Sequence, residues 1–527
     1  MTRVSCESNE PLPLPPPVPQ PCRAEEVKQG SYGQILKSSA MVGGSSAINI
    51  VIGIVRTKAI AMLLGPAGFG LFGLFGAVAN LTQTVAGMGV NSSGVRQIAE
   101  AVGTGNSVRV AQTTIVLRRV SVLLGLIGAV LLIVFRRPVA ELTFGSAELA
   151  PEVALLSAAV FFTLVSAGQG ALIQGMRRVA DLAKMSVLGP LFGTIIGIAL
   201  VYFFRDRGVV PALIAVAAAA AAASWWYSRK IRIEMPSLSA LFVTQEAGAL
   251  LKLGFAFMSS GLMTIGTAYA VRIMILHRYG LADTGLYQSA WTLGGLYVGV
   301  ILQAMAADFY PRLTASANNN PECNRLVNEQ AHVGVLLAGP GVIATLTIAP
   351  LIVVLFYSSK FGAAVGILRW ICLGAMIQVI SWPMGFIIVA KARQVIFFSC
   401  ELAWTVVSLV LAWVCLEYFG IDGAGIAFFG SYIFHAVMLY AVVSRLSGFR
   451  WSAEAARACV LFLLIVGGVF VGFRLLPFIW ASVAGVTAAI LSGIYSIRAL
   501  LHLVPAESIP GRVRKVFVLL RMAPATF

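Results

Sequence analysis

The sequence predicts an all-α integral membrane protein of about 14 transmembrane helices, with two parallel-repeat six-helix lobes around a central cavity plus two C-terminal helices. Hydrophobic residues make up 59% of the 527 residues and charged residues only 11%, a composition that cannot cover a water-soluble surface. Apolar stretches recur at about the 20-residue length that an α-helix needs to cross a bilayer. Short sequence motifs of the first half also recur in the second half at one constant spacing, which indicates an internal duplication.

The apolar stretches are the expected transmembrane helices, taken in chain order. They lack the roughly ten-residue alternating pattern of an outer-membrane barrel strand, so we interpret each as a helix. They fall at 37–64, 69–95, 120–135, 154–174, 185–204, 210–227, 250–276, 285–307, 333–357, 363–390, 395–417, 423–443, 456–473 and 478–500.

Two landmarks of the first half recur 215 residues later. Gly70, in the turn GPAGFGLF, matches Gly285 in GLADTGLY, and Arg178 in QGMRR matches Arg393 in VAKAR at the same spacing. The offset pairs helices 1–6 with helices 7–12. Because six is even, both halves keep one orientation in the membrane, and duplicated halves of this kind are typical of transporters.

Composition and loop charge divide the chain into six parts. Lys and Arg gather in loops on one side of the helices, which predicts that both termini are cytoplasmic. This topology also accounts for most of the net charge of +17, so no nucleic-acid partner is expected. The parts are a disordered Pro-rich cytoplasmic tail (1–30), an N-lobe (31–227), a cytoplasmic linker (228–249), a C-lobe (250–447), the two extra helices (448–503) and a basic cytoplasmic tail (504–527).

Cysteine and histidine give no sign of a metal centre. The seven cysteines include no CxxC spacing, and the four histidines are scattered. The proline-rich start PLPLPPPVPQP does not resemble a signal peptide. We therefore expect no metal, no cofactor and no catalytic residue.

Cations inside the apolar segments are the candidate substrate-binding residues: Arg56, Lys58, Arg272, Arg278 and Arg369. A Lys or Arg near the bilayer centre costs about 2.5–3.5 kcal/mol on insertion scales, so it needs a partner or water. Snorkelling to the interface competes as an explanation for the last three cations. Nearby helices carry few carboxylates, so the cations favour an anionic ligand in a watery cavity, such as phosphate, pyrophosphate or an acidic sugar.

Two further groups of residues each have two explanations. A polar face on the second helix either lines the cavity or forms hydrogen bonds between helices; its members are Asn80, Thr82, Gln83, Thr84, Asn91, Ser92 and Ser93. Glycines in the fifth helix allow either close helix packing or a bend, and these are Gly189, Gly193 and Gly197.

Four motifs occur in a distinctive order: GPAGFGLFGLF, GVRQIAEA, FYPRLTASAN and SSKFGAAVGILRWICLGAMIQVISWPMGFIIVAKAR. With the duplicated halves, they resemble the polysaccharide transport branch of the multidrug/oligosaccharidyl-lipid/polysaccharide (MOP) exporter superfamily, in particular the Wzx-type O-antigen translocases. The resemblance covers about residues 31–447. The proline-rich tail and the last two helices depart from the usual twelve-helix pattern.

The resemblance implies a flippase rather than an enzyme. It would move an undecaprenyl-pyrophosphate-linked oligosaccharide, an O-antigen or exopolysaccharide repeat unit, from the cytoplasmic to the periplasmic leaflet of a bacterial inner membrane by alternating access. The family's cavity-facing cations in helices 1 and 7 correspond to Arg56 and Arg272, with Lys58 a weaker match. Implied partners are the lipid-linked oligosaccharide, membrane lipids and polysaccharide polymerase machinery.

Two alternatives remain open. A multidrug antiporter of the same superfamily would need acidic residues to attract organic cations, whereas this cavity is expected to be positive. An intramembrane polysaccharide ligase or polymerase would need large outer loops with Arg and His, whereas the expected outer loops are short.

Overall fold

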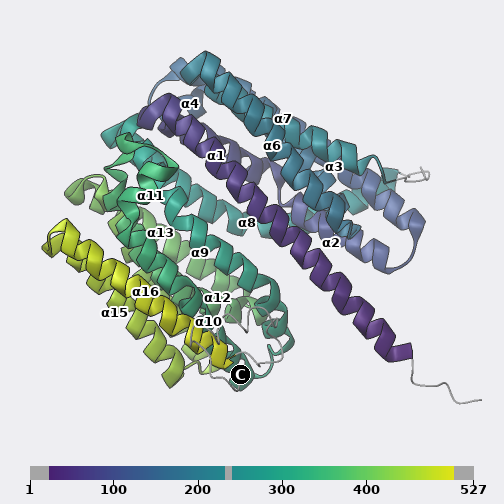
Figure 1. Cartoon of the computed structure of the whole chain (residues 1–527). Coiled ribbons are helices and arrows are strands. Elements are labelled where there is room, and N and C mark those ends of the chain that lie inside the picture. The colour runs from purple at the N-terminus through teal and green to yellow at the C-terminus, as the bar shows by residue number, and fades with distance from the viewer. Residues whose placement is uncertain (1–22, 232–239, 504–527) are drawn as a thin grey trace, which may run out of the picture.

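The computed structural model describes residues 23–231 and 240–503, and within these ranges the chain is built from α-helices and three short 3₁₀ turns, without a β-strand (Figure 1). The predicted all-α membrane fold is confirmed. The proline-rich stretch predicted at the start and the basic tail predicted for 504–527 lie outside the described residues.

The N-lobe contains the first seven helices. The long helix α1 has a kink at Gly65, where φ is +69° and ψ is −170°, a conformation that favours glycine, and Pro66 starts the second arm. Residues 23–30 belong to α1, although the sequence analysis placed them in the tail. The helices are α1 (Arg23–Gly87), α2 (Val90–Gly103), α3 (Ser107–Val134), α4 (Arg136–Phe144), α5 (Ala150–Gly175), α6 (Val179–Phe204) and α7 (Val209–Ser228).

The C-lobe lies beside the N-lobe as a second bundle (Figure 1). Helices α15 and α16 pack on α10, at the edge of the C-lobe away from the N-lobe. Residues 240–249, predicted as linker, are already helical. The helices are α8 (Ala240–Tyr279), α9 (Leu281–Ala315), α10 (Asn320–Thr347), α11 (Ala349–Phe356), α12 (Ala364–Ala390), α13 (Gln394–Phe419), α14 (Asp422–Ser447), α15 (Ala453–Leu475) and α16 (Phe478–Leu503).

Ten stretches of the described chain are long and apolar enough to cross a membrane. Two of them, Gly43–Gly87 and Val179–Ser228, each overlap two of the expected segments, whereas α8 and α9 are not among the ten. Each of the 14 expected segments overlaps a helix. The exact number of membrane crossings therefore stays a prediction.

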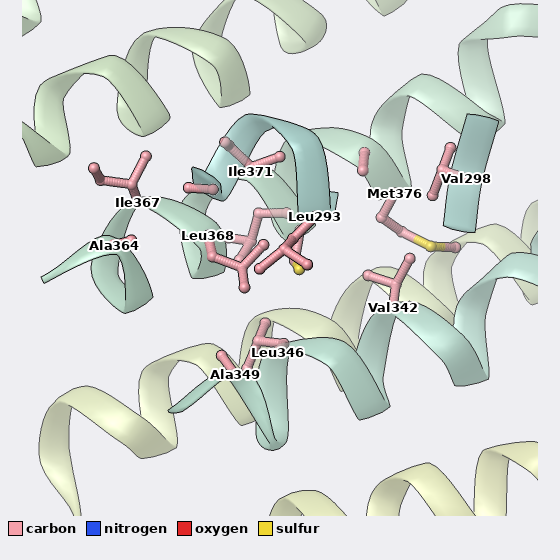
Figure 2. Packing of buried hydrophobic residues seen from close by; sticks show 14 of the residues in the cluster. Leu293, Val298, Val342, Leu346, Ala349, Ala364, Ile367, Leu368, Ile371 and Met376 are labelled. Atoms are coloured by element: carbon pink, nitrogen blue, oxygen red, sulfur yellow. The ribbon is translucent and has the colours of Figure 1, made fainter. Parts of the chain in front are cut away.

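The core of the C-lobe forms where α9, α10 and α12 meet. Figure 2 shows Leu293 of α9, Leu346 of α10 and Leu368 of α12 turned toward one another, and all three are buried. Burial of such side chains holds the helices in place. Val298 and Ile371, labelled in the same view, also line a cavity described below.

Glycines of α6 allow it to pack closely against the alanine-rich α7. A Cβ atom added at Gly193 would lie 2.6 Å from the Cα of Val216, and one added at Gly189 would lie 2.8 Å from the Cα of Ala220. No real side chain fits at such distances. Of the two explanations for these glycines, the structure shows close helix packing.

Replacing Gly193 by leucine should therefore lower the free energy of unfolding by about 1–3 kcal/mol, the usual cost of overpacking. Thermal unfolding of the purified protein in detergent measures the effect. Gly468→Leu is the matched control, since Gly468 is exposed on α15 and an added Cβ would meet no atom within 4 Å. Equal stability of the two variants would contradict the packing argument.

Candidate functional site

The two lobes meet where α1 and α2 pack against α8 and α9. At one end, Gly70 of α1 lies against Gly285 of α9, and a Cβ on either would overlap a backbone carbonyl oxygen of the other helix. At the other end, Gly89 lies against Gly254 of α8 in the same way. Close backbone contacts thus join the two lobes near both ends of their interface, and we call these two contacts the closures. The first contact joins the two positions related by the duplication.

A cavity of about 340 Å³ lies between these two closures, and we call it the N-lobe cavity. Met258 and Ile265 of α8 contribute to its wall. Most of the polar face predicted from the sequence lines it, namely Asn80, Gln83, Thr84, Asn91 and Ser92. The hydroxyls of Thr82 and Ser93 instead donate to backbone carbonyls of their own helices.

A second cavity of about 240 Å³, the C-lobe cavity, is enclosed by α8, α9, α12, α13 and α14. Much of its wall is aromatic, formed by Tyr287, Trp291, Trp404, Phe428 and Tyr432. The sequence analysis did not predict this cavity. Its rings come from α9 and from the consecutive helices α13 and α14, which lie far from α9 in the chain. The available signal in the sequence was the pair of aromatic residues one turn apart on α9 and the similar pair on α14.

Arg272 lies beside the C-lobe cavity. Its Nε donates to Oε1 of Gln288 at 2.7 Å and its Nη1 to the carbonyl of Ala268 at 2.6 Å, while the guanidinium lies 5.9 Å from the ring centroids of Tyr287 and Trp291. The residue is only 8% exposed, which excludes snorkelling in this conformation. Within the described residues it has no carboxylate partner, so no acidic side chain of that part of the chain neutralises its charge.

Arg56, on the first arm of α1, is partly buried. Its Nε is buried and has no hydrogen-bond partner, and the described residues offer the side chain neither a hydrogen bond nor an ion pair. Leaving a buried donor unpaired costs about 1–3 kcal/mol, and more when the donor is charged. Ile60 and Ala61, about one turn further along, belong to the same buried cluster as Val271, next to Arg272.

Lys58 and Arg278 have partners within the protein. Lys58 Nζ donates to the carbonyl of Leu355 in the last turn of α11 at 2.7 Å, a bond that joins the two lobes. Arg278, at the end of α8, forms an ion pair with Glu417 of α13 at 2.8 Å.

Arg369 lies on α12 and faces the extra helices. Its guanidinium carbon lies 3.8 Å from the ring centroid of Phe473 on α15, and its Nε donates to the carbonyl of Leu346 at 3.4 Å. One of its amino groups, Nη2, is buried without a partner. The structure therefore does not gather the five candidate cations in one place. Arg56 and Arg272 lie on helices that meet, α1 and α8, whereas Lys58 contacts α11, Arg278 contacts α13 and Arg369 contacts α15. Of these five cations, only Arg278 has a carboxylate partner among the described residues.

Comparison with known proteins agrees with this architecture. The Lipid III flippase of Escherichia coli (strain K12) is 22% identical over 420 residues, covering 76% of this chain and 95% of that protein. Among solved structures, the Lipid II flippase MurJ in an inward closed conformation has a TM-score of 0.66 at 14% identity, covering 87% of this chain and 99% of that one. An inward-facing multidrug resistance MATE family transporter of the MOP superfamily has a TM-score of 0.64 at 18% identity, covering 76% and 95%.

These solved structures confirm the fold, and every relative named here is a flippase or a transporter, as expected for a transporter rather than an enzyme. Residues 59–366, more than half of the chain, match the family described as polysaccharide biosynthesis protein. The match includes Arg272 and starts just after Arg56 and Lys58. The chain belongs to this polysaccharide biosynthesis protein family.

Proposed function

We propose that this protein is a flippase that moves an undecaprenyl-pyrophosphate-linked oligosaccharide, such as an O-antigen or exopolysaccharide repeat unit, across a bacterial inner membrane. The observation that carries the proposal is the pair formed by the partly buried Arg56 and the buried Arg272, one from each lobe, without carboxylate partners in the described residues. The Lipid III flippase and the Lipid II flippase among the relatives support a lipid-linked substrate.

A pyrophosphate suits two guanidinium groups because each guanidinium can form two parallel, charge-assisted hydrogen bonds to phosphate oxygens. The sugar and pyrophosphate would cross between the lobes while the polyprenyl tail stays in lipid. Since the cytoplasm is negative, outward movement of the anion is favoured by about 2.3 kcal/mol per charge for each 100 mV. Polymerase machinery is the proposed recipient of the product.

The orientation is part of the proposal. The cytoplasmic loops carry the excess of Lys and Arg. In Figure 1, α1 begins and α16 ends at the same lower side of the molecule, which supports two termini in one compartment. With both termini cytoplasmic, the contact between Gly70 and Gly285 lies on the periplasmic side.

Lys58, Arg278 and Arg369 have secondary roles in the proposal. The bond from Lys58 to Leu355 joins the lobes, so it must break when they separate, and Lys58 then becomes free to bind the anion. Arg278 and Arg369 lie near helix ends and would contact the substrate only after giving up their present partners.

A multidrug antiporter is the second candidate, because the aromatic wall of the C-lobe cavity could attract an organic cation. Arg272 argues against it, since its guanidinium lies 5.9 Å from two of these rings and would repel a cation.

Transport by the reconstituted full-length protein separates the two functions. In vesicles with a fluorescent undecaprenyl-pyrophosphate-linked sugar, we expect the probe to equilibrate between leaflets, measured by its exposure to dithionite added outside. Protein-free vesicles should keep the inner-leaflet probe protected. Ethidium efflux without movement of the lipid-linked probe would instead support the multidrug antiporter.

A further inference from the structure

Two buried polar atoms in the wall of the C-lobe cavity have no hydrogen-bond partner. They are Nε1 of Trp404 and Oγ of Ser408, which lie one turn apart on α13. Buried polar groups in folded proteins are nearly always paired, so two unpaired groups on residues that line one cavity require an explanation. A polar ligand in the cavity would supply the partners.

Besides these polar groups, the wall of the C-lobe cavity carries five aromatic side chains. Tyr287, Trp291, Phe428, Tyr432 and Trp404 follow one another with ring centroids 5.9, 5.4, 4.8 and 5.6 Å apart. The series runs from α9 through α14 to α13, so it offers extended ring faces and edges on which a flat, partly apolar ligand can pack.

The cavity also has a free amide and open space. Gln378 of α12 lines it, and no described residue forms a hydrogen bond with its side chain. Gly295 and Gly299 of α9 form part of the wall, and a Cβ added at either would meet no atom within 4 Å. By contrast, the hydroxyls of Thr267 and Ser431 already donate to backbone carbonyls.

We infer that the C-lobe cavity is a subsite for one pyranose ring of the transported oligosaccharide, an inference that rests on the proposed function. The C–H face of the sugar packs on the aromatic wall, and its hydroxyls pair with Trp404 Nε1, Ser408 Oγ and the amide of Gln378. The volume of about 240 Å³ is below the roughly 300–1,000 Å³ of pockets for drug-sized ligands, which suits one ring rather than the whole oligosaccharide.

Other occupants fit less well. An isoprenyl chain would cover the rings but leave the Trp404 and Ser408 groups unpaired. An organic cation would face the positive charge of Arg272 beside Tyr287 and Trp291. The same neighbourhood suits a sugar attached to pyrophosphate: the phosphates lie at Arg272, and the ring next to them enters the cavity.

Ligand-observed NMR titration of the purified full-length protein with methyl glucopyranoside, methyl galactopyranoside and methyl N-acetylglucosaminide tests the inference. We expect at least one glycoside to bind. Trp404→Phe keeps a ring but removes the donor, and Ser408→Ala removes the hydroxyl, so each should weaken binding about fivefold. Gly295→Val should fill the cavity and abolish binding, whereas Gly468→Val, at an equally open position on α15, should bind as the wild type does.

Absence of glycoside binding, or variants of Trp404 and Ser408 that bind as well as the control, would overturn the inference. So would displacement of the glycoside by farnesol or by tetraphenylphosphonium, which would identify a lipid or organic-cation site. Should Gly295→Val fail to fold, the other two variants still decide. If the wild-type protein moves the lipid-linked probe between leaflets but binds no glycoside, only this inference is overturned. If the wild-type protein does not move that probe, the proposed function is overturned.

Discussion

Replacing Arg56 and Arg272 together by alanine should abolish translocation of the lipid-linked sugar while the protein still inserts and folds. Hydrogen bonds to charged groups contribute about 1.5–3 kcal/mol each, so losing one such bond at each arginine should weaken binding of the pyrophosphate about a hundredfold or more. The folded state loses hydrogen bonds at only one of the two positions. Arg56 Nε has no partner to give up, and Arg272 gives up its bonds to Gln288 and Ala268.

The measurement is the leaflet exchange of the fluorescent lipid-linked probe, with surface polysaccharide in cells as a second readout. Arg56→Lys with Arg272→Lys should give an intermediate rate, because the charge remains but the two-pronged geometry is lost. Arg325→Ala is the matched control: among the described residues, this exposed arginine of α10 bonds to Glu322 and Glu329 alone, and it lines neither cavity. Normal surface polysaccharide in the double alanine variant would refute the assignment of the site.

Local sequence patterns predicted most of the fold because the length and hydropathy of a membrane helix are local properties. Helix boundaries that depend on a few backbone angles were harder to predict. The segment expected at 333–357 is two helices, α10 and α11, since Pro350 at the start of α11 cannot continue the hydrogen bonds of α10. Likewise, Ala240 begins α8 well before the expected helix start, inside a polar stretch that hydropathy assigned to the linker.

The candidate site was only partly accessible from the sequence. The polar face on α1 and α2 could be found because its residues are close in the chain and share a side. Which cations lack partners could not be known, because the partners of Lys58 and Arg369 are Leu355 and Phe473, which approach only after the bundle has folded. The sequence could not show that Trp404 Nε1 and Ser408 Oγ are unpaired either, because their surroundings also form only after the bundle has folded.

Replacing Gly70 or Gly285 by valine should stop transport by preventing the lobes from closing at that end. A Cβ at either position would overlap a backbone carbonyl oxygen, and such an overlap cannot be relieved by rotating a side chain. Most members of the two buried clusters come from one lobe each, so the variants should still fold with the lobes held apart at the Gly70 end, although Ile60, Ala61 and Phe69 of α1 would lose contacts with the C-lobe cluster. Gly76→Val is the control on the same helix, because an added Cβ there meets no atom within 4 Å.

The side of the membrane from which a reagent can reach the N-lobe cavity shows which end of the lobe interface fails to close. In a chain without native cysteines, a cysteine at Asn80 should react with a membrane-impermeant maleimide from the Gly70 side in the Gly70 and Gly285 variants. Valine at Gly89 or Gly254 opens the opposite closure, so labelling should then come from the other side. An alternating-access carrier must close each end in turn, and both pairs of variants should therefore lose transport while showing opposite sidedness. Normal transport, or labelling from one side in all four variants, would mean that these glycine contacts are not the closures of the cavity.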